Sequence, residues 1–149
     1  MEDISQNRAI NTLRKIPVFA GLQNDEYHLL LSICAVNRYR TGDVIFRVKD
    51  TSNAMYVLLS GQVEMQTENG KCMFIMKPGD LFGEIGVICQ VQRTASAVVS
   101  EDSVLLELAR DKFDFLLGKN PLVMAKILRN VAKVLAERLV GNSQQRYIL

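Results

Sequence analysis

Hydrophobic and polar positions alternate with a helical period near the start of the chain. From about Ser5 to Ile16 apolar residues recur every three or four positions, and Pro17 then ends the helix. A second helix is predicted from Asn24, a good N-cap residue followed by acids that the helix dipole favours. Residues 1–35 are therefore expected to form two short helices.

The pattern changes to short β-rich runs punctuated by glycine between residues 36 and 109. Asn69-Gly70 between two runs predicts a tight hairpin, and Ser60-Gly61 predicts a further turn. About eight short strands with close turns favour an antiparallel β-roll, a jelly-roll-like barrel. The runs cover residues 44–46, 54–59, 62–67, 71–76, 94–99 and 104–108.

Helical periodicity returns over residues 110–140. A short helix is expected to end around Gly118, and Asn120-Pro121 supplies an N-cap and a first-turn proline for a long helix over about 122–140. Its single apolar stripe either docks on the sheet or pairs with a second copy of the chain. With a tail over 141–149, the expected fold class is mainly β with flanking helices, in one domain over 1–149.

The net charge of the chain does not identify a binding partner. The formal net charge of +2 over 149 residues is too weak to indicate nucleic-acid binding. Its distribution is uneven, and the basic end of the chain is either a solvated helix face or a patch for a partner. Against Glu137 alone, that end carries Lys119, Lys126, Arg129, Lys133, Arg138 and Arg146.

Few residues suit catalysis or metal binding. The three cysteines lack CxxC spacing, which predicts buried free thiols and neither a disulfide framework nor a zinc site. With a single histidine and no recognisable nucleophile and base pair, the sequence predicts no enzyme, no metal and no cofactor. Apolar runs are too short to span a bilayer and the N-terminus lacks a secretory signal, so a cytoplasmic location is expected.

The segment from Asp80 to Arg93 breaks the strand pattern. Gly83 permits a close backbone approach, and a helical turn starting at Glu84 would offer free N–H groups to an anion. Arg93 follows nine residues later, where its guanidinium fork suits a phosphate. On physical grounds alone, Glu84 and Arg93 fit a structural ion pair as well as a ligand site.

A family resemblance adds to this interpretation. The run Phe82-Gly83-Glu84-Ile85-Gly86, followed by Arg93-Thr94-Ala95, resembles the phosphate-binding cassette of the cyclic nucleotide-binding domain family. This family includes the catabolite activator protein, regulatory subunits of cyclic AMP-dependent protein kinase and cyclic nucleotide-gated channels. The resemblance extends over nearly the whole chain, from the N-terminal helical pair to the two C-terminal helices.

The resemblance implies a role for each cassette residue. Glu84 would accept a hydrogen bond from the ribose 2′-hydroxyl, Arg93 would neutralise the cyclic phosphate, and Thr94 would offer a hydroxyl to phosphate or purine. Phe82 and Gly83 would begin the phosphate cradle, and backbone N–H groups of Ile85-Gly86 and of Ala95 would complete it. Many family members carry alanine where this chain has Gly86. Met65 and Phe74 are either base contacts or plain core residues, and Arg138 and Tyr147 are either lid residues over the base or a solvated arginine and part of a frayed tail.

The resemblance therefore implies a ligand sensor, with cyclic AMP favoured over cyclic GMP, that signals through its C-terminal helices. Nine residues after Val140 are too few for a helix-turn-helix, so the expected partner is a protein effector, with a possible homodimer through the C-terminal helix. The alternative is an interaction module that has lost its ligand and uses its basic helix to contact a protein or nucleic acid.

Overall fold

The computed structural model describes residues 4–141, which fall into two compact units. One unit comprises residues 31–115 and contains the sheet. The other combines the N-terminal helices with the chain from Leu116 onward. Each unit is described by itself.

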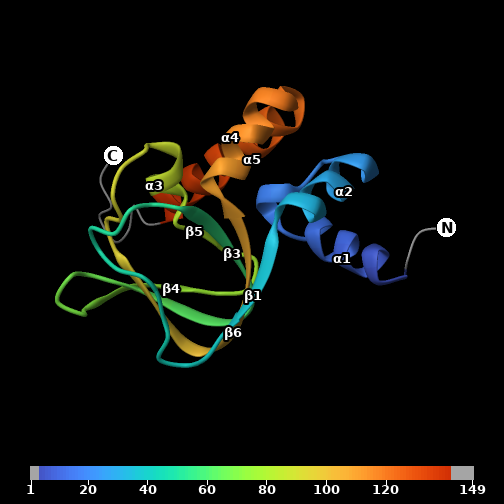
Figure 1. Ribbon diagram of the computed structural model, residues 1–149. Coiled ribbons are helices and arrows are strands. Elements are labelled where there is room, and N and C mark those ends of the chain that lie inside the picture. The colour runs from blue at the N-terminus through green and yellow to red at the C-terminus, as the bar shows by residue number, and fades with distance from the viewer. Residues whose placement is uncertain (1–3, 142–149) are drawn as a thin grey trace. The chain divides into compact units, whose positions relative to one another are not determined.

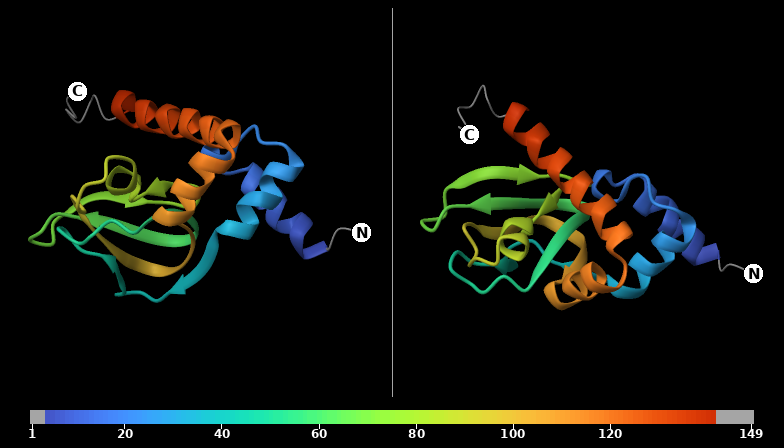
Figure 2. Two further views of the ribbon diagram at one scale, coloured as in Figure 1. Left: turned by 45° about the horizontal axis from the view of Figure 1, so that its top comes forward. Right: turned by 90° about the horizontal axis from the view of Figure 1, so that it is seen from above.

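Helices make up the second unit. They are α1 (Ile4–Arg14), the 3₁₀ turn η1 (Pro17–Phe19), α2 (Asn24–Ile33) and α5 (Pro121–Gly141), and α4 (Arg110–Lys119) leads into it from the sheet. Figure 2 shows α5 as one uninterrupted helix in orange and red. Its start agrees with the predicted cap, because Asn120 Oδ1 accepts a hydrogen bond from the Val123 N–H at 3.3 Å.

Polar contacts fix α5 to the N-terminal segment within this unit. Lys126 Nζ donates to Glu26 Oε1 at 2.7 Å, and the Gln23 N–H donates to the same oxygen at 2.8 Å. Asn130 Nδ2 donates to the carbonyls of Val18 and Ala20. The bonds made by Lys126 and Asn130 are not revealed by sequence periodicity, since their partners lie at least 100 residues away in the chain.

Glu26 predicts a loss of stability in acid. The Lys126 hydrogen bond, together with the Gln23 N–H and the ammonium charge, lowers the pKa of Glu26 from its ordinary value of 4.5 despite burial. Its stabilising contribution is complete above pH 4.5 and is lost as the pH falls through the lowered pKa. Glu26→Gln should reduce the unfolding free energy at pH 7 by about 1–2 kcal/mol, because Lys126 then loses a charged acceptor.

Denaturant unfolding at pH 7 and at pH 3 measures this effect. The difference between parent and Glu26→Gln should shrink at the lower pH, because Glu26 takes up a proton as the pH falls toward its lowered pKa. Glu68→Gln is the matched control, since the Glu68–Lys49 pair is about 70% exposed at both side chains and should contribute almost nothing. An equal loss in both variants would contradict the assignment.

Six antiparallel strands form the sheet of the other unit (Figure 1). The central order is β1-β6-β3-β4, with β2 also pairing with β6 and β5 with β3. The predicted class, mainly antiparallel β with flanking helices, is confirmed; the described strands number six and do not close into a barrel. They are β1 (Ala35–Tyr39), β2 (Val44–Phe46), β3 (Ala54–Gln66), β4 (Cys72–Met76), β5 (Leu81–Phe82) and β6 (Ser96–Ala109).

Two pairs of the predicted runs are continuous strands, 54–59 with 62–67 in β3 and 94–99 with 104–108 in β6, whereas β1 and β5 were not among the predicted runs. Ser60-Gly61 is a disruption within β3, whose register against β6 shifts between Leu58 and Val63. Gly61 has φ +96°, which lets β3 pass through this irregularity without turning back. Sequence alone does not separate such a bulge from a hairpin turn, since both favour glycine.

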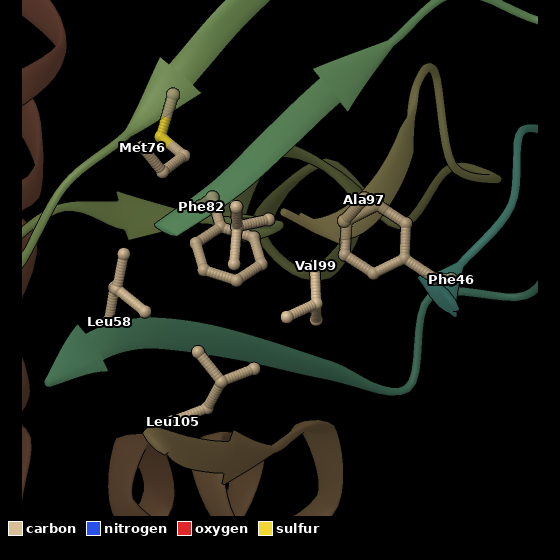
Figure 3. Packing of buried hydrophobic residues seen from close by; sticks show 8 residues of the cluster. Phe46, Leu58, Met76, Phe82, Ala97, Val99 and Leu105 are labelled. Atoms are coloured by element: carbon tan, nitrogen blue, oxygen red, sulfur yellow. The ribbon is translucent and has the colours of Figure 1, made fainter. Parts of the chain in front are cut away.

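The core lies inside the curved sheet (Figure 3). Phe46, Leu58, Phe82 and Val99 come from four different strands and pack together with Met76, Ala97 and Leu105. Alternation along β6 places Ala97 and Val99 in this core and leaves Val98, between them, less buried. Phe82 of β5 thus belongs to this core, and β5 leads into the candidate cassette.

The expectation of buried thiols is wrong for two cysteines. Cys72, at the start of edge strand β4, and Cys89, at the C-cap of α3 (Glu84–Ile88), are exposed. Cys34 is half-buried, and burial raises its pKa to about 12. Within the described residues, no helix is both long enough and apolar enough to cross a membrane.

Candidate functional site

The cassette begins where β5 ends. Gly83 has φ +78° and caps the short helix α3, which runs from Glu84 to Ile88 beside β5 and β3 (Figure 1). A Cβ atom on Gly83 would lie 2.9 Å from Arg93 Nη1, so the position requires glycine for its conformation and for space. The turn after β5 and the arginine ten residues later are thus built against each other.

Arg93 lies just before β6 and is buried, with 5% of its surface exposed. Its Nη1 donates to the Gly83 carbonyl at 2.7 Å, and its Nη2 donates to the Ala54 carbonyl. The buried Nε atom has no hydrogen-bond partner, the one such side-chain atom identified in the part of the chain described. Because an unpaired buried donor is costly, this N–H fits a site that an anion completes.

Aromatic rings form the floor beneath Arg93. Its guanidinium carbon lies 4.0 Å from the centroid of the Phe46 ring and 5.9 Å from that of Tyr56. Tyr56 in turn stacks on Phe82 with centroids 5.3 Å apart. The rings fix the guanidinium plane and exclude water from one side of it.

Burial lowers the pKa of Arg93, whereas the charges of Tyr56, Asp50 and Glu84 oppose that shift. Arginine nevertheless stays charged at neutral pH because its ordinary pKa is so high. Glu84 is the first residue of α3 and is only 3% exposed. The cassette therefore buries a cation and a carboxyl group close enough to influence each other.

The segment between β2 and β3, residues 47–53, also belongs to the site and was not predicted. The Lys49 N–H donates to the Arg93 carbonyl and the Arg93 N–H donates to the Asp50 carbonyl, both at 2.9 Å. Ser52 Oγ donates to the Val91 carbonyl at 2.7 Å. Lys49 adopts φ +76°, a value that nothing in its side chain signals.

The remaining predicted site residues differ in burial and in location. Ala95, two residues after Arg93, is buried, and so is Gly86 in α3. Thr94 and Ile85 are exposed. Met65 and Phe74 are register partners on β3 and β4, and both pack against the core cluster. Of the proposed lid residues, Arg138 is half-buried on α5 in the other unit, and Tyr147 lies outside the described residues.

This geometry suits the binding of a small anion. The Arg93 guanidinium is bonded to Gly83 at the start of α3 and carries an unpaired N–H, and the first N–H groups of a helix attract negative charge. A buried carboxyl group at the same place can accept hydrogen bonds from hydroxyl groups. Together these groups could bind an anion that carries hydroxyl groups.

Comparisons with known proteins agree with this geometry. The family model "Cyclic nucleotide-binding domain" matches residues 36–120. The "Cyclic AMP receptor protein" of Thermus thermophilus is 37% identical over 127 residues, which are 83% of this chain and 57% of that protein. The crystal structure of the Thermus thermophilus catabolite activator protein matches with a TM-score of 0.72 at 34% identity, covering 87% of this chain and 61% of the other.

A cyclic nucleotide-binding domain from Methylobacillus flagellatus has the same fold, with a TM-score of 0.83 at 21% identity and coverage of 95% of this chain and 82% of the other. The chain thus spans little more than half the length of the receptor that it resembles in sequence. Because the family model matches more than half of the residues, including the whole cassette, the chain belongs to the cyclic nucleotide-binding domain family.

Proposed function

We propose that this chain is a cytoplasmic sensor that binds cyclic AMP in preference to cyclic GMP and is not itself an enzyme. The buried Arg93 guanidinium carries the proposal, because its unpaired Nε–H lies in a cassette of the matching family. Preference for cyclic AMP is supported by similarity to a protein named for that ligand. The whole chain is proposed to act as one nucleotide-binding domain.

Arg93 neutralises the cyclic phosphate, with backbone N–H groups from Ile85-Gly86 and Ala95 beside it. Glu84 accepts a hydrogen bond from the ribose 2′-hydroxyl, and Gly83 allows the chain to pass close to the ligand. Thr94 offers its exposed hydroxyl to phosphate or purine. Phe82 supports the cassette from the core, and base contacts are assigned to Met65 and Phe74, with Arg138 and Tyr147 from the C-terminal region.

Signalling is proposed to occur through the C-terminal helices. A ligand changes an equilibrium between two arrangements only through different affinities for them, and the cassette supplies such a difference if it tightens on the nucleotide. The output then passes to a protein effector or to a second copy of this chain bound through α5. Intact Glu84 and Arg93, both buried, favour a ligand-binding role over an interaction module that has lost its ligand.

The role of Glu84 predicts that the protein recognises the ribose 2′-hydroxyl. Calorimetric titration should give at least about tenfold tighter binding of cyclic AMP than of its 2′-deoxy analogue, since a hydrogen bond to a carboxylate contributes about 1.5–3 kcal/mol. Glu84→Gln should lose most of that discrimination by binding cyclic AMP more weakly.

Linear adenosine 5′-monophosphate and cyclic GMP serve as control ligands for the same titrations. The Glu84 assignment fails if the Gln variant still separates cyclic AMP from the deoxy analogue as the parent does. No binding of either cyclic nucleotide by the folded parent would overturn the proposed function itself.

A further inference from the structure

We propose that Ser52 is a positioning residue for the cassette and that its side chain occupies the space that a side chain at position 86 would need. The positioning role rests on the proposed function, because it takes cyclic AMP as the ligand. The packing relation between Ser52 and Gly86 rests on the geometry alone. It makes Ser52 and Gly86 a complementary pair, in which each residue is acceptable because of the other.

Space around Gly86 is the first observation. A Cβ atom built on Gly86 would lie 1.9 Å from Ser52 Oγ and 2.5 Å from Ser52 Cβ, far inside normal contact. The backbone of Gly86 does not have a positive φ in the left-handed region, so alanine is compatible with its local conformation. The next nearest atom, the Val91 carbonyl oxygen, would lie 3.2 Å away, so the principal obstacle to a methyl group is the side chain of Ser52, 34 positions earlier.

Ser52 is also tied to the end of the cassette. It is 2% exposed, and its Oγ donates to the Val91 carbonyl at 2.7 Å. The Val91 N–H in turn donates to the Gly86 carbonyl at 3.2 Å, which closes the turn after α3. The Ser52 hydroxyl therefore connects the segment before β3 to Val91, and the Val91 N–H continues the connection to Gly86.

The same segment holds Arg93. Two residues before Ser52, the Asp50 carbonyl accepts from the Arg93 N–H, and the Lys49 N–H donates to the Arg93 carbonyl. The backbone position of Arg93 determines where its guanidinium lies over Phe46. Any shift between Ser52 and α3 should therefore move both the start of the phosphate cradle and the arginine that completes it.

The proposal predicts how the two positions depend on each other. In Gly86→Ala the new methyl group meets Ser52 and pushes α3 away. In Ser52→Gly a small void forms and the Val91 carbonyl loses its donor. In the double variant the alanine methyl group enters the void, so the packing is restored by a different residue although the hydroxyl is absent.

A double-mutant cycle on the full chain tests this, with cyclic AMP affinity by calorimetry and the ligand-free unfolding midpoint as separate measurements. Gly86→Ala should weaken binding by about tenfold or more and lower the midpoint. The double variant should bind cyclic AMP with an affinity within about threefold of that of Ser52→Gly. Gly118→Ala is the matched control, because Gly118 is also helical and an added Cβ there meets nothing within 4 Å.

Each outcome bears on a stated part of the proposal. If the double variant binds and unfolds like Gly86→Ala, the complementary pair is disproved. If Gly86→Ala lowers the midpoint but the folded protein binds cyclic AMP as the parent does, the positioning role is disproved and only packing remains. A parent that binds neither cyclic nucleotide overturns the proposed function and the positioning role, and the spatial pair is then decided by the midpoints alone.

Discussion

Replacing Arg93 by alanine is expected to reduce the affinity for cyclic AMP by at least about a hundredfold. A hydrogen bond between charged groups contributes about 1.5–3 kcal/mol, so two such bonds from one guanidinium amount to two or more factors of ten. Arg93 is positioned for this before any ligand arrives, because Gly83 and Ala54 carbonyls hold its Nη atoms and Phe46 supports its plane. Calorimetric titration of the folded variant measures the loss.

The alanine variant also removes hydrogen bonds to two backbone carbonyls, so its stability must be followed separately. Arg93→Lys keeps the charge but lacks the planar fork that reaches both Gly83 and Ala54, and it should bind with an intermediate affinity. Arg38→Ala removes an exposed arginine on β1 and should leave binding unchanged. Binding by folded Arg93→Ala with the parent's affinity would refute the phosphate assignment.

Much of the architecture follows from local signals in the sequence. Asn24 and Asn120 mark the starts of α2 and α5, and Pro17 separates α1 from the next turn, because capping and proline effects act within a few residues. Asn69-Gly70 likewise forms the expected turn between β3 and β4, where the Thr67 N–H donates to the Lys71 carbonyl. Such features are predictable since their causes lie next to each other in the chain.

The sequence predicts only part of the candidate site, because some of the residues that form it lie far apart in the chain. Gly83, Glu84 and Arg93 lie within one short segment, so their motif is visible in the sequence. Phe46, Ser52 and Ala54, which support Arg93 or α3, come from a part of the chain about 40 residues earlier. Their contacts depend on how β2 and β3 approach the cassette, and no composition or spacing rule encodes that approach.

Gly61→Ala is expected to be the most destabilising glycine-to-alanine substitution outside the cassette. Gly61 has φ +96°, and a Cβ atom there would lie 2.3 Å from the Asp102 carbonyl oxygen and 2.7 Å from Ser103 Cα. These are backbone atoms of β6, which is paired with β3 on both sides of the bulge and cannot move aside cheaply. Backbone strain and overpacking together should lower the unfolding free energy by about 4 kcal/mol.

Gly70→Ala distinguishes the effect of backbone strain from that of overpacking. Gly70 has a similar φ of +85°, but an added Cβ there meets nothing within 4 Å, so only strain of about 1–2 kcal/mol should appear in denaturant unfolding. Removing the Ser103 side chain as well, in Gly61→Ala/Ser103→Gly, should rescue little, because the backbone contacts remain. Equal losses for Gly61→Ala and Gly70→Ala would mean that β6 yields at this point, and the bulge would then not be a fixed contact between the two longest strands.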